Sequence, residues 1–173
     1  MSEKDRTPAT ESAPLDEPVA VGAPAPQFEL PAVAPDGSQF TVTTQGLVGK
    51  RVLLVFYQDD GMPVCTSELK AFAQEHQTLT EARVTVFGFN TNGLGSHARF
   101  QERDQFPFAL ISDFFGDVVK AFGLWDNDER KSRRALVILS PDGIVEYVQP
   151  HFNPGNLAGF EAVFEALGLL EPL

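Results

Sequence analysis

The sequence has few residues that bind metals or form covalent links. It contains one cysteine and three histidines among 173 residues. A single cysteine cannot form an internal disulfide, and thiolate-rich zinc and iron–sulfur sites need several cysteine ligands. The histidines, His76, His97 and His151, are scattered without the short spacing that metal-binding motifs show. We therefore expect no resident metal and no cofactor.

Basic charge is also scarce, because 13 lysine and arginine residues face 24 aspartate and glutamate residues, for a net charge of −11. This balance argues against binding nucleic acid or an anionic membrane through a basic surface. The longest strongly apolar run, residues 52–57, is far shorter than the roughly 20 residues of a membrane span. Residues 1–26 lack the apolar stretch of a secretory signal. We expect no nucleic-acid partner, no membrane partner and a cytoplasmic location.

Length and composition together predict one folded domain with a short extension. Hydrophobic residues make up 43% of the chain, which is enough for a sizeable core. Residues 1–20 mix charges with proline, alanine and serine, and they cannot bury enough apolar surface to offset the entropy cost of ordering. We predict a disordered tail over residues 1–20 and one domain over residues 21–173.

Short β-rich runs alternate with segments of helical periodicity. Strands are expected at residues 28–30, 39–42, 52–57, 84–90, 108–111, 135–139 and 144–148. Helices are expected from Pro63 to Leu79, from a cap at Ser96, over residues 115–123 and over residues 156–167. Strands separated by helices pair in parallel, and hairpins at both ends add antiparallel strands. The prediction is an α/β fold with a mixed central sheet flanked by helices and an N-terminal β-hairpin.

Cys65 is the residue whose position favours nucleophilic chemistry. It comes after the buried strand 52–57 and the loop 58–62, in the first turn of the helix that Pro63 opens. Unpaired N–H groups and the positive end of the helix dipole favour the thiolate, which lowers a free thiol pKa of about 8.5. The junction also lies at the carboxyl edge of the sheet, where α/β folds carry their sites. A small buried structural cysteine is the alternative interpretation.

Three other polar features receive a structural interpretation. Asp59 and Asp60 are adjacent in the loop before the cysteine and are interpreted as a solvated pair. His76 falls on the apolar face of its helix and is predicted to pack in the core. The segment from Trp125 through the basic run 130–134 is predicted to be a mobile loop near the mouth of the site.

Five features in order resemble the peroxiredoxin superfamily, the alkyl hydroperoxide reductase C and thiol-specific antioxidant group. They are VGAPAPQF at 21–28, LLVFY at 53–57, PVCTSE at 63–68, FPFALISD at 106–113, and Arg134. The third is similar to the Pro-Gly-Cys-Thr-x-Glu of the Q type, also called bacterioferritin-comigratory protein. The resemblance covers residues 22–148, about three quarters of the chain.

This resemblance implies a thioredoxin-like fold and a thiol-dependent peroxidase that reduces hydrogen peroxide, organic hydroperoxides or both. Cys65 would be the peroxidatic residue, and its thiolate would attack the peroxide to give a sulfenic acid. Arg134 would hold the thiolate and the peroxide oxygens, and Glu68 would orient that arginine. Thr66 would add a further donor. Arg133 is a weaker candidate because alternation along a strand points it to the other face.

The residues just before the cysteine depart from the family pattern. Gln58 stands where the family has proline, and Met62 where it has a threonine whose hydroxyl contacts thiolate and peroxide. Met62, Pro63 and Val64 would line the peroxide pocket, with Val64 in place of the usual glycine. Methionine offers only a weak acceptor. The departures leave an alternative function: a non-catalytic redoxin, a redox-sensing or binding module with a degraded peroxide site.

With no second cysteine, the resolving thiol must come from outside the chain. The resemblance therefore implies a one-Cys cycle, with a hydroperoxide as substrate and an external thiol as reductant. That reductant would be a thioredoxin-like protein or a small thiol, and pairing with Cys65 of a second copy is a further route. We expect a monomer or a weak homodimer.

Overall fold

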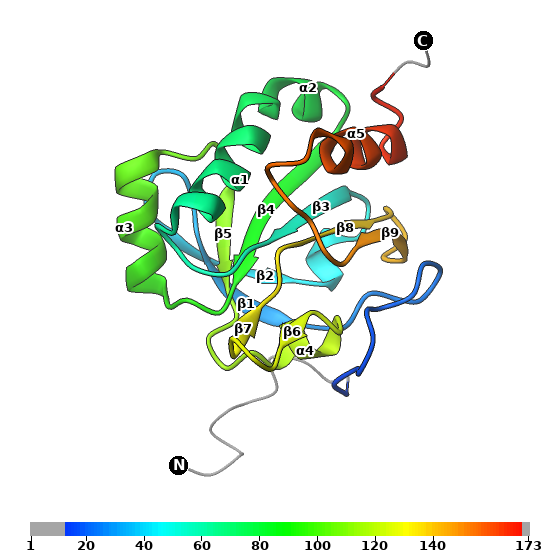
Figure 1. Ribbon diagram of the computed structural model, residues 1–173, viewed down its shortest axis with the longest axis horizontal. Helices are drawn as coiled ribbons and strands as arrows, with labels where there is room; N and C mark the ends of the chain where they lie inside the picture. The colour runs from blue at the N-terminus through cyan, green and yellow to red at the C-terminus, as the bar shows by residue number, and fades with distance from the viewer. Residues whose placement is uncertain (1–12, 171–173) are drawn as a thin grey trace.

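The computed structural model describes residues 13–170 and shows one layered α/β arrangement, with a central sheet between helices (Figure 1). The strands are β1 (Glu29–Val33), β2 (Gln39–Thr43), β3 (Arg51–Phe56), β4 (Val84–Asn90), β5 (Ala109–Ser112), β6 (Trp125–Asp126), β7 (Lys131–Ser132), β8 (Ala135–Leu139) and β9 (Val145–Gln149). The helices are α1 (Pro63–Gln74), α2 (His76–Glu81), α3 (Leu94–Asp104), α4 (Asp117–Ala121) and α5 (Leu157–Ala166), with a 3₁₀ turn, η2 (Gln45–Leu47).

The main sheet has seven strands in the order β2-β1-β5-β4-β3-β8-β9. β3, β4 and β5 are parallel, as expected for strands joined by helices. β8 runs antiparallel to β3, and the β1–β2 hairpin joins the other side of the sheet through antiparallel pairing of β1 with β5. The predicted mixed sheet with its N-terminal hairpin is confirmed.

β3 lies in the middle of the sheet and is buried on both faces, as its unbroken apolar run predicts. Alternate side chains enter two separate cores. Val52, Leu54 and Phe56 pack in the core that also holds residues of α4. Leu53 and Val55 pack in the core that holds residues of α1, α3 and α5. The sheet therefore divides the apolar interior in two, and its carboxyl edge forms the floor of the candidate site.

The predicted helix from Pro63 to Leu79 is broken at Glu75, where α1 ends and α2 begins. The break turns His76 away from the core, so the predicted core position is wrong: His76 is half-buried and its ring lies 3.4 Å from the Thr80 hydroxyl. The predicted cap at Ser96 is also wrong. α3 begins at Leu94, so Ser96 lies within the helix and is free to donate elsewhere.

The N-terminal segment contacts the domain upstream of the predicted boundary at residue 21. The first part of the expected tail, residues 1–12, lies outside the described residues. From residue 13 on, the backbone N–H of Leu15 donates to Lys120 and that of Val19 to Phe122, and Val19 is buried. A Cβ atom on Gly123 would lie 1.9 Å from the Glu17 carbonyl oxygen. Only glycine permits this close approach.

Arg51, at the start of β3, ties the sheet to the last helix. Its guanidinium donates to the Glu146 carboxylate on β9 at 2.8 Å. It also donates to the carbonyls of Ala166 and Leu167 at 3.1 and 3.0 Å. These carbonyls end α5 and have no partner within the helix, so a cation satisfies both their hydrogen bonds and the helix dipole.

Candidate active site

Cys65 lies where β3 passes through a short loop into α1. Met62 is the N-cap, and Pro63 takes the first helical position, where its missing N–H costs nothing. The Cys65 side chain is 0% exposed and packs in the helix-side core. Its sulfur lies 3.8 Å from the Met62 sulfur, which is a weak contact between a thiol and a thioether. The nucleophile is therefore covered, and Met62 is part of the cover.

Burial raises the pKa of the Cys65 thiol above its ordinary value, which corrects the expectation of a lowered pKa. Desolvation of the thiolate is the largest cause of the rise. Backbone hydrogen bonding from Asp59 and Gln58 opposes it. The Glu68 carboxyl adds to it, and the Arg134 guanidinium lowers it. The surroundings of Cys65 therefore disfavour its thiolate overall, although Arg134 and two backbone groups of the loop favour it.

Arg134 immediately precedes β8, whose pairing with β3 places the arginine at the same sheet edge as the cysteine. Its Nη1 donates to the Gln58 side-chain oxygen at 2.9 Å. Its Nε is buried and has no hydrogen-bond partner in the described part of the chain. The guanidinium therefore has donor capacity that a bound oxygen can use.

Glu68 does not orient the arginine in the way that the resemblance implied. Its side chain is fully buried, and within residues 13–170 neither carboxyl oxygen has a hydrogen-bond partner. Burial raises the pKa of this carboxyl well above its usual range, and the charge of Arg134 only partly offsets that rise. Burial therefore favours the uncharged form of this carboxyl, and Gln58 is the side chain that accepts a hydrogen bond from Arg134.

The other predicted site residues lie at the start of α1, next to Cys65 in the chain. The Thr66 hydroxyl accepts a 3.3 Å hydrogen bond from Arg103 of α3, so it is engaged on the helix side. Of the three residues expected to line the peroxide pocket, Met62 contacts the cysteine sulfur. Pro63 and Val64 are exposed, Val64 to 45%. The exposed pair can contact a substrate only outside the cover over the sulfur.

The two loop aspartates are not a solvated pair, which corrects the sequence interpretation. Asp59 accepts a hydrogen bond from Lys131 of β7, and this raises the pKa of the lysine. Asp60 turns the other way and lies in a polar cluster under the loop. Its carboxylate accepts from the Tyr57 hydroxyl at 2.6 Å and the Ser96 hydroxyl at 2.7 Å. The loop before the cysteine is held from both sides.

His97 completes this cluster and is fully buried. One ring nitrogen lies 2.6 Å from Asp60, and the other lies 3.0 Å from the Ile111 carbonyl. Burial alone would raise the pKa of Asp60, but the hydrogen bonds and charge of His97, with the two hydroxyls, leave it lowered. The sequence carried one signal of this cluster. Asp60 follows β3 and His97 follows β4, and the carboxyl ends of adjacent parallel strands meet at one edge.

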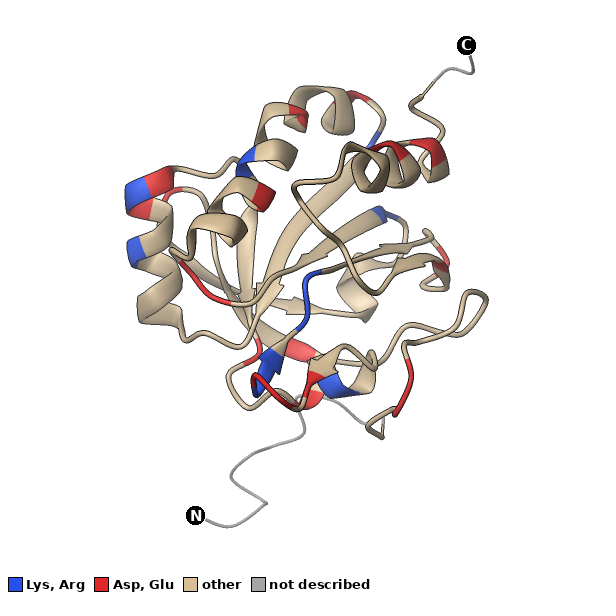
Figure 2. Ribbon diagram, in the orientation of Figure 1, with Lys and Arg blue, Asp and Glu red and all other residues tan. Residues whose placement is uncertain are grey.

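A polar cavity of 470 Å³ gives access to the arginine. It is lined by Gln58, Asp126, Asp128, Arg133, Arg134, His151, Phe152 and Asn153. Arg133 faces it too, with its guanidinium 3.3 Å from the His151 ring. Basic residues gather on β7 and on the segment that leads into β8, in a chain that is otherwise acidic (Figure 2). The expected mobile loop is instead the β6–β7 hairpin, which walls this cavity.

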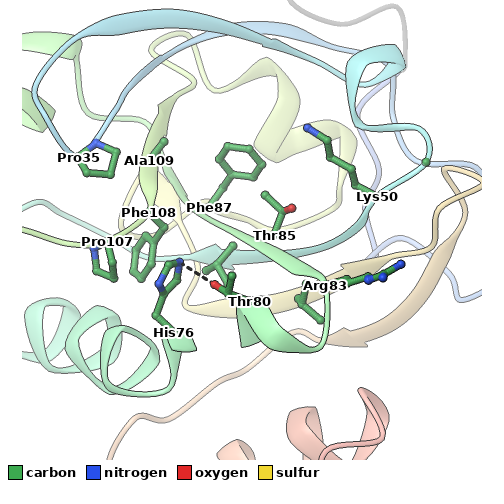
Figure 3. A pocket seen from close by; sticks show the side chains of 13 residues that line it. Pro35, Lys50, His76, Thr80, Arg83, Thr85, Phe87, Pro107, Phe108 and Ala109 are labelled. Carbon is green, nitrogen blue, oxygen red and sulfur yellow. Dashed lines mark hydrogen bonds between the residues drawn. The ribbon is translucent and has the colours of Figure 1, made fainter. Parts of the chain in front are cut away.

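A second cavity, of 510 Å³, lies at the opposite edge of the sheet, at the amino ends of β4 and β5 (Figure 3). Lys50, His76, Arg83 and Phe108 line it, and it contains none of the predicted site residues. Within the described range 13–170, no group of three or more histidine, cysteine, aspartate or glutamate residues could hold a metal ion. No helix there is long and apolar enough to cross a membrane.

Comparison with known proteins places this geometry in a family. Residues 21–148 match the AhpC/TSA family. Peroxiredoxin Bcp of Escherichia coli is 30% identical over 145 residues, which cover 80% of this chain and 90% of that protein. The chloroplastic 2-Cys peroxiredoxin BAS1 of Spinacia oleracea is 28% identical over 181 residues, covering 100% of this chain and 66% of that protein.

The solved structures agree. The reduced 2-Cys peroxiredoxin of Plasmodium vivax superposes with a TM-score of 0.77 at 26% identity, covering 87% of this chain and 97% of that one. The predictions of a thioredoxin-like fold and of a peroxiredoxin-type thiol peroxidase nearest the Q type are confirmed. The chain belongs to the AhpC/TSA family of peroxiredoxins.

Proposed function

We propose that Cys65 is the peroxidatic residue of this thiol peroxidase. Its thiolate attacks the terminal oxygen of a hydroperoxide, a sulfur–oxygen bond forms and the oxygen–oxygen bond breaks. The leaving alkoxide or hydroxide takes up a proton and departs as an alcohol or water. Sulfur loses two electrons, the peroxide gains them, and Cys65 becomes a sulfenic acid.

One observation carries this assignment: Cys65 lies after the end of β3, at the sheet edge that also carries Arg134. The positive charge of Arg134 favours the Cys65 thiolate, as does backbone hydrogen bonding from Asp59 and Gln58. Negative charge moves from sulfur to the leaving oxygen during the displacement. Fixed donors that follow this charge stabilise the transition state more than the ground state. The Nε of Arg134, which has no hydrogen-bond partner among residues 13–170, is available for the peroxide oxygens.

The covered thiol gives the reaction two requirements. The thiol must ionise, so the oxidation rate rises with pH towards the raised pKa of Cys65. The peroxide must also reach a sulfur that is 0% exposed, so the cover formed by Met62 has to move. We propose that small hydroperoxides enter beside Arg134, from the 470 Å³ cavity.

An external thiol completes the cycle, because the chain has no second cysteine. The reductant thiolate attacks the sulfenic sulfur and releases water, and a second thiol then frees Cys65 as the mixed disulfide breaks. A thioredoxin-like protein or a small thiol in a reducing compartment such as the cytoplasm fits this need. Every proposed site residue comes from one chain, so we expect a monomer or weak homodimer to suffice, which analytical ultracentrifugation would measure.

The test is the second-order rate of Cys65 oxidation by hydrogen peroxide and by an organic hydroperoxide. Trp125, the chain neighbour of the cavity-lining Asp126, serves as the stopped-flow fluorescence reporter, and mass spectrometry identifies the sulfenic acid. We expect a rate orders of magnitude above a free thiol, abolished in Cys65→Ser. Arg134→Ala should lose roughly 10²–10³-fold, as for other removed transition-state donors. Arg99→Ala, an exposed arginine of α3, is the matched control and should react like the wild type.

A wild-type rate equal to that of free cysteine would contradict this function. The burial of Cys65 and the methionine over it would then support the alternative, a non-catalytic redoxin.

A further inference from the structure

The 510 Å³ cavity at the amino ends of β4 and β5 has the size and the apolar lining of a small-molecule site (Figure 3). Such sites commonly have volumes of about 300–1,000 Å³. The cavity lies at the end of the sheet, where side chains of both apolar cores meet the surface. Its buried apolar lining consists of Val84, Val86, Phe87, Phe108 and Ala109.

Basic side chains line the same cavity, and no aspartate or glutamate does so among the described residues. Lys50 directly precedes β3, Arg83 directly precedes β4, and His76 begins α2. The side chains of Lys50 and Arg83 are exposed, and neither makes a hydrogen bond or an ion pair with another residue between 13 and 170. Two positive charges are therefore available here, in a chain whose net charge is −11.

Arg83 has a backbone conformation that favours glycine. Its φ is +61°, in the left-handed region. It follows Ala82, the C-cap of α2, at the position where helices most often have glycine. An arginine there costs folding free energy that a glycine would not cost. A strained residue of this kind indicates a role for its side chain other than stabilising the fold.

The charged and apolar groups lie at different ends of the cavity. Figure 3 shows Lys50 and Arg83 towards one end and Phe108 towards the other, with Phe87 between them. The ring of His76 lies beside Phe108, with 6.4 Å between the ring centres. A ligand that matches this arrangement has a negative charge at one end and an apolar body at the other.

We propose that this cavity binds a small organic carboxylate with an apolar body. The carboxylate lies at the end formed by Lys50 and Arg83, where the guanidinium offers paired donors that fit a carboxylate. The apolar body lies over Phe87 towards Phe108, and its removal from water contributes affinity. The cavity is at the opposite edge of the sheet from Cys65, so this proposal does not depend on the peroxidase function.

The experiment uses octanoate as the probe and follows the amide NMR spectrum of the isotope-labelled full chain, which reports both affinity and location. The amide signals of residues 83–87 and 107–109 should shift and reach saturation. Butanoate keeps the carboxylate but has a shorter apolar body, and it should bind at least roughly tenfold more weakly. Octanol keeps the apolar body but has no charge, and it should bind about tenfold more weakly.

Arg83→Gly removes the guanidinium and suits the left-handed backbone. It should weaken octanoate binding about threefold, the scale of one exposed ion pair, without lowering the urea midpoint of unfolding. Lys50→Gln should weaken binding by a similar factor, and the double variant by roughly tenfold. Arg130→Gly is the matched control, because Arg130 is also exposed with a φ of +56° but lies between β6 and β7, outside the cavity. It should bind octanoate like the wild type.

Several results would overturn the proposal. One is octanoate binding that does not saturate, or that shifts the amide signals of the apolar groove between α1 and α5 instead. Equal affinity for octanol would show that the charges play no part, and an equal loss in Arg83→Gly and Arg130→Gly would show that only net charge matters. A lower urea midpoint in Arg83→Gly would show that the fold itself requires this arginine.

Discussion

Asp113 gives a stability prediction whose size follows from its surroundings. The residue follows β5, is fully buried, and accepts the backbone N–H of Val119 at 2.7 Å, which caps α4. Its second oxygen has no partner within residues 13–170. Burial raises the pKa of Asp113 from 3.8 to about 6, with Asp117 adding to the rise and Lys120 and the α4 N–H groups opposing it. The perturbation is Asp113→Asn, which keeps an acceptor for Val119 and cannot ionise.

The sign follows from which state releases its proton first. The unfolded chain loses the Asp113 proton near 3.8, whereas the folded chain holds it until about 6. The stability that this group contributes is therefore complete below 3.8, falls as the pH rises to about 6, and is constant above that. A difference of 2.2 pKa units, at 1.36 kcal/mol each, amounts to about 3 kcal/mol. The asparagine variant lacks this fall.

The assay is urea unfolding of both proteins at several values between pH 4 and pH 7.5, with intrinsic fluorescence as the probe. The variant carries a constant offset, since its amide N–H groups fill a place without an acceptor, at about 1–3 kcal/mol. The slope is the test: relative to the wild type, the variant should gain about 2.4 kcal/mol of the full ~3 kcal/mol between pH 4 and pH 7. A difference in unfolding free energy that stays constant with pH would refute the inference that burial makes ionisation of Asp113 unfavourable in the folded protein.

Three further predictions concern the loop, the helix and the N-terminal segment. Asp60→Asn puts an amide group where a carboxylate accepts hydrogen bonds from Tyr57 and Ser96 and meets the buried His97 ring at 2.6 Å, and urea unfolding should show a loss of about 1–3 kcal/mol; a loss below about 0.5 kcal/mol would contradict the view that this cluster stabilises the fold. Burial favours the uncharged form of Glu68, and Glu68→Gln gives an uncharged side chain of similar size, so stopped-flow oxidation at pH 7 should stay within about twofold of the wild type; a tenfold loss would show that the carboxylate is needed. Gly123→Ala forces the Glu17 carbonyl away, so limited proteolysis before residue 20 should accelerate and the free energy of unfolding should fall by about 1–3 kcal/mol. An unchanged cleavage rate would show that this contact does not fix the N-terminal segment to the domain.

The elements that the sequence predicts well are those whose signal is local. The apolar runs of β3 and β4 and the proline that opens α1 mark their own positions. The break at Glu75 has no such mark, since the apolar spacing continues across it from α1 into α2. The N-terminal contact at Val19 also escaped prediction, because the charged and proline-rich composition around it outweighs one buried side chain.

For the candidate site, motif and position select Cys65 and Arg134 as proposed site residues, and the β3–β8 pairing explains why both lie at one edge of the sheet. Their contacts with neighbouring residues are harder to predict. The thiol pKa was predicted in the wrong direction, because the sequence shows the helix N-terminus but not the burial that is the largest cause of the rise. Gln58 as the partner of Arg134, and Asp60 as the partner of His97, depend on contacts between residues 76 and 37 positions apart. Contacts between residues so far apart in the chain produce no periodic pattern in the sequence.

The placement of β3 has a consequence for how the chain is made. This central strand pairs with β4, which follows soon after, and with β8, where Val52 meets Leu139. The hydrogen bonds of Arg51, at the start of β3, form later still, because their acceptor carbonyls lie 115 and 116 residues further along the chain. The chain leaves the ribosome with its N-terminus first. The edge of β3 that pairs with β8 therefore has no partner strand until most of the protein has been synthesised. Arg134, which we propose acts on the peroxide, belongs to that same late portion, so the nascent chain contains Cys65 for much of its synthesis before it contains the complete candidate site.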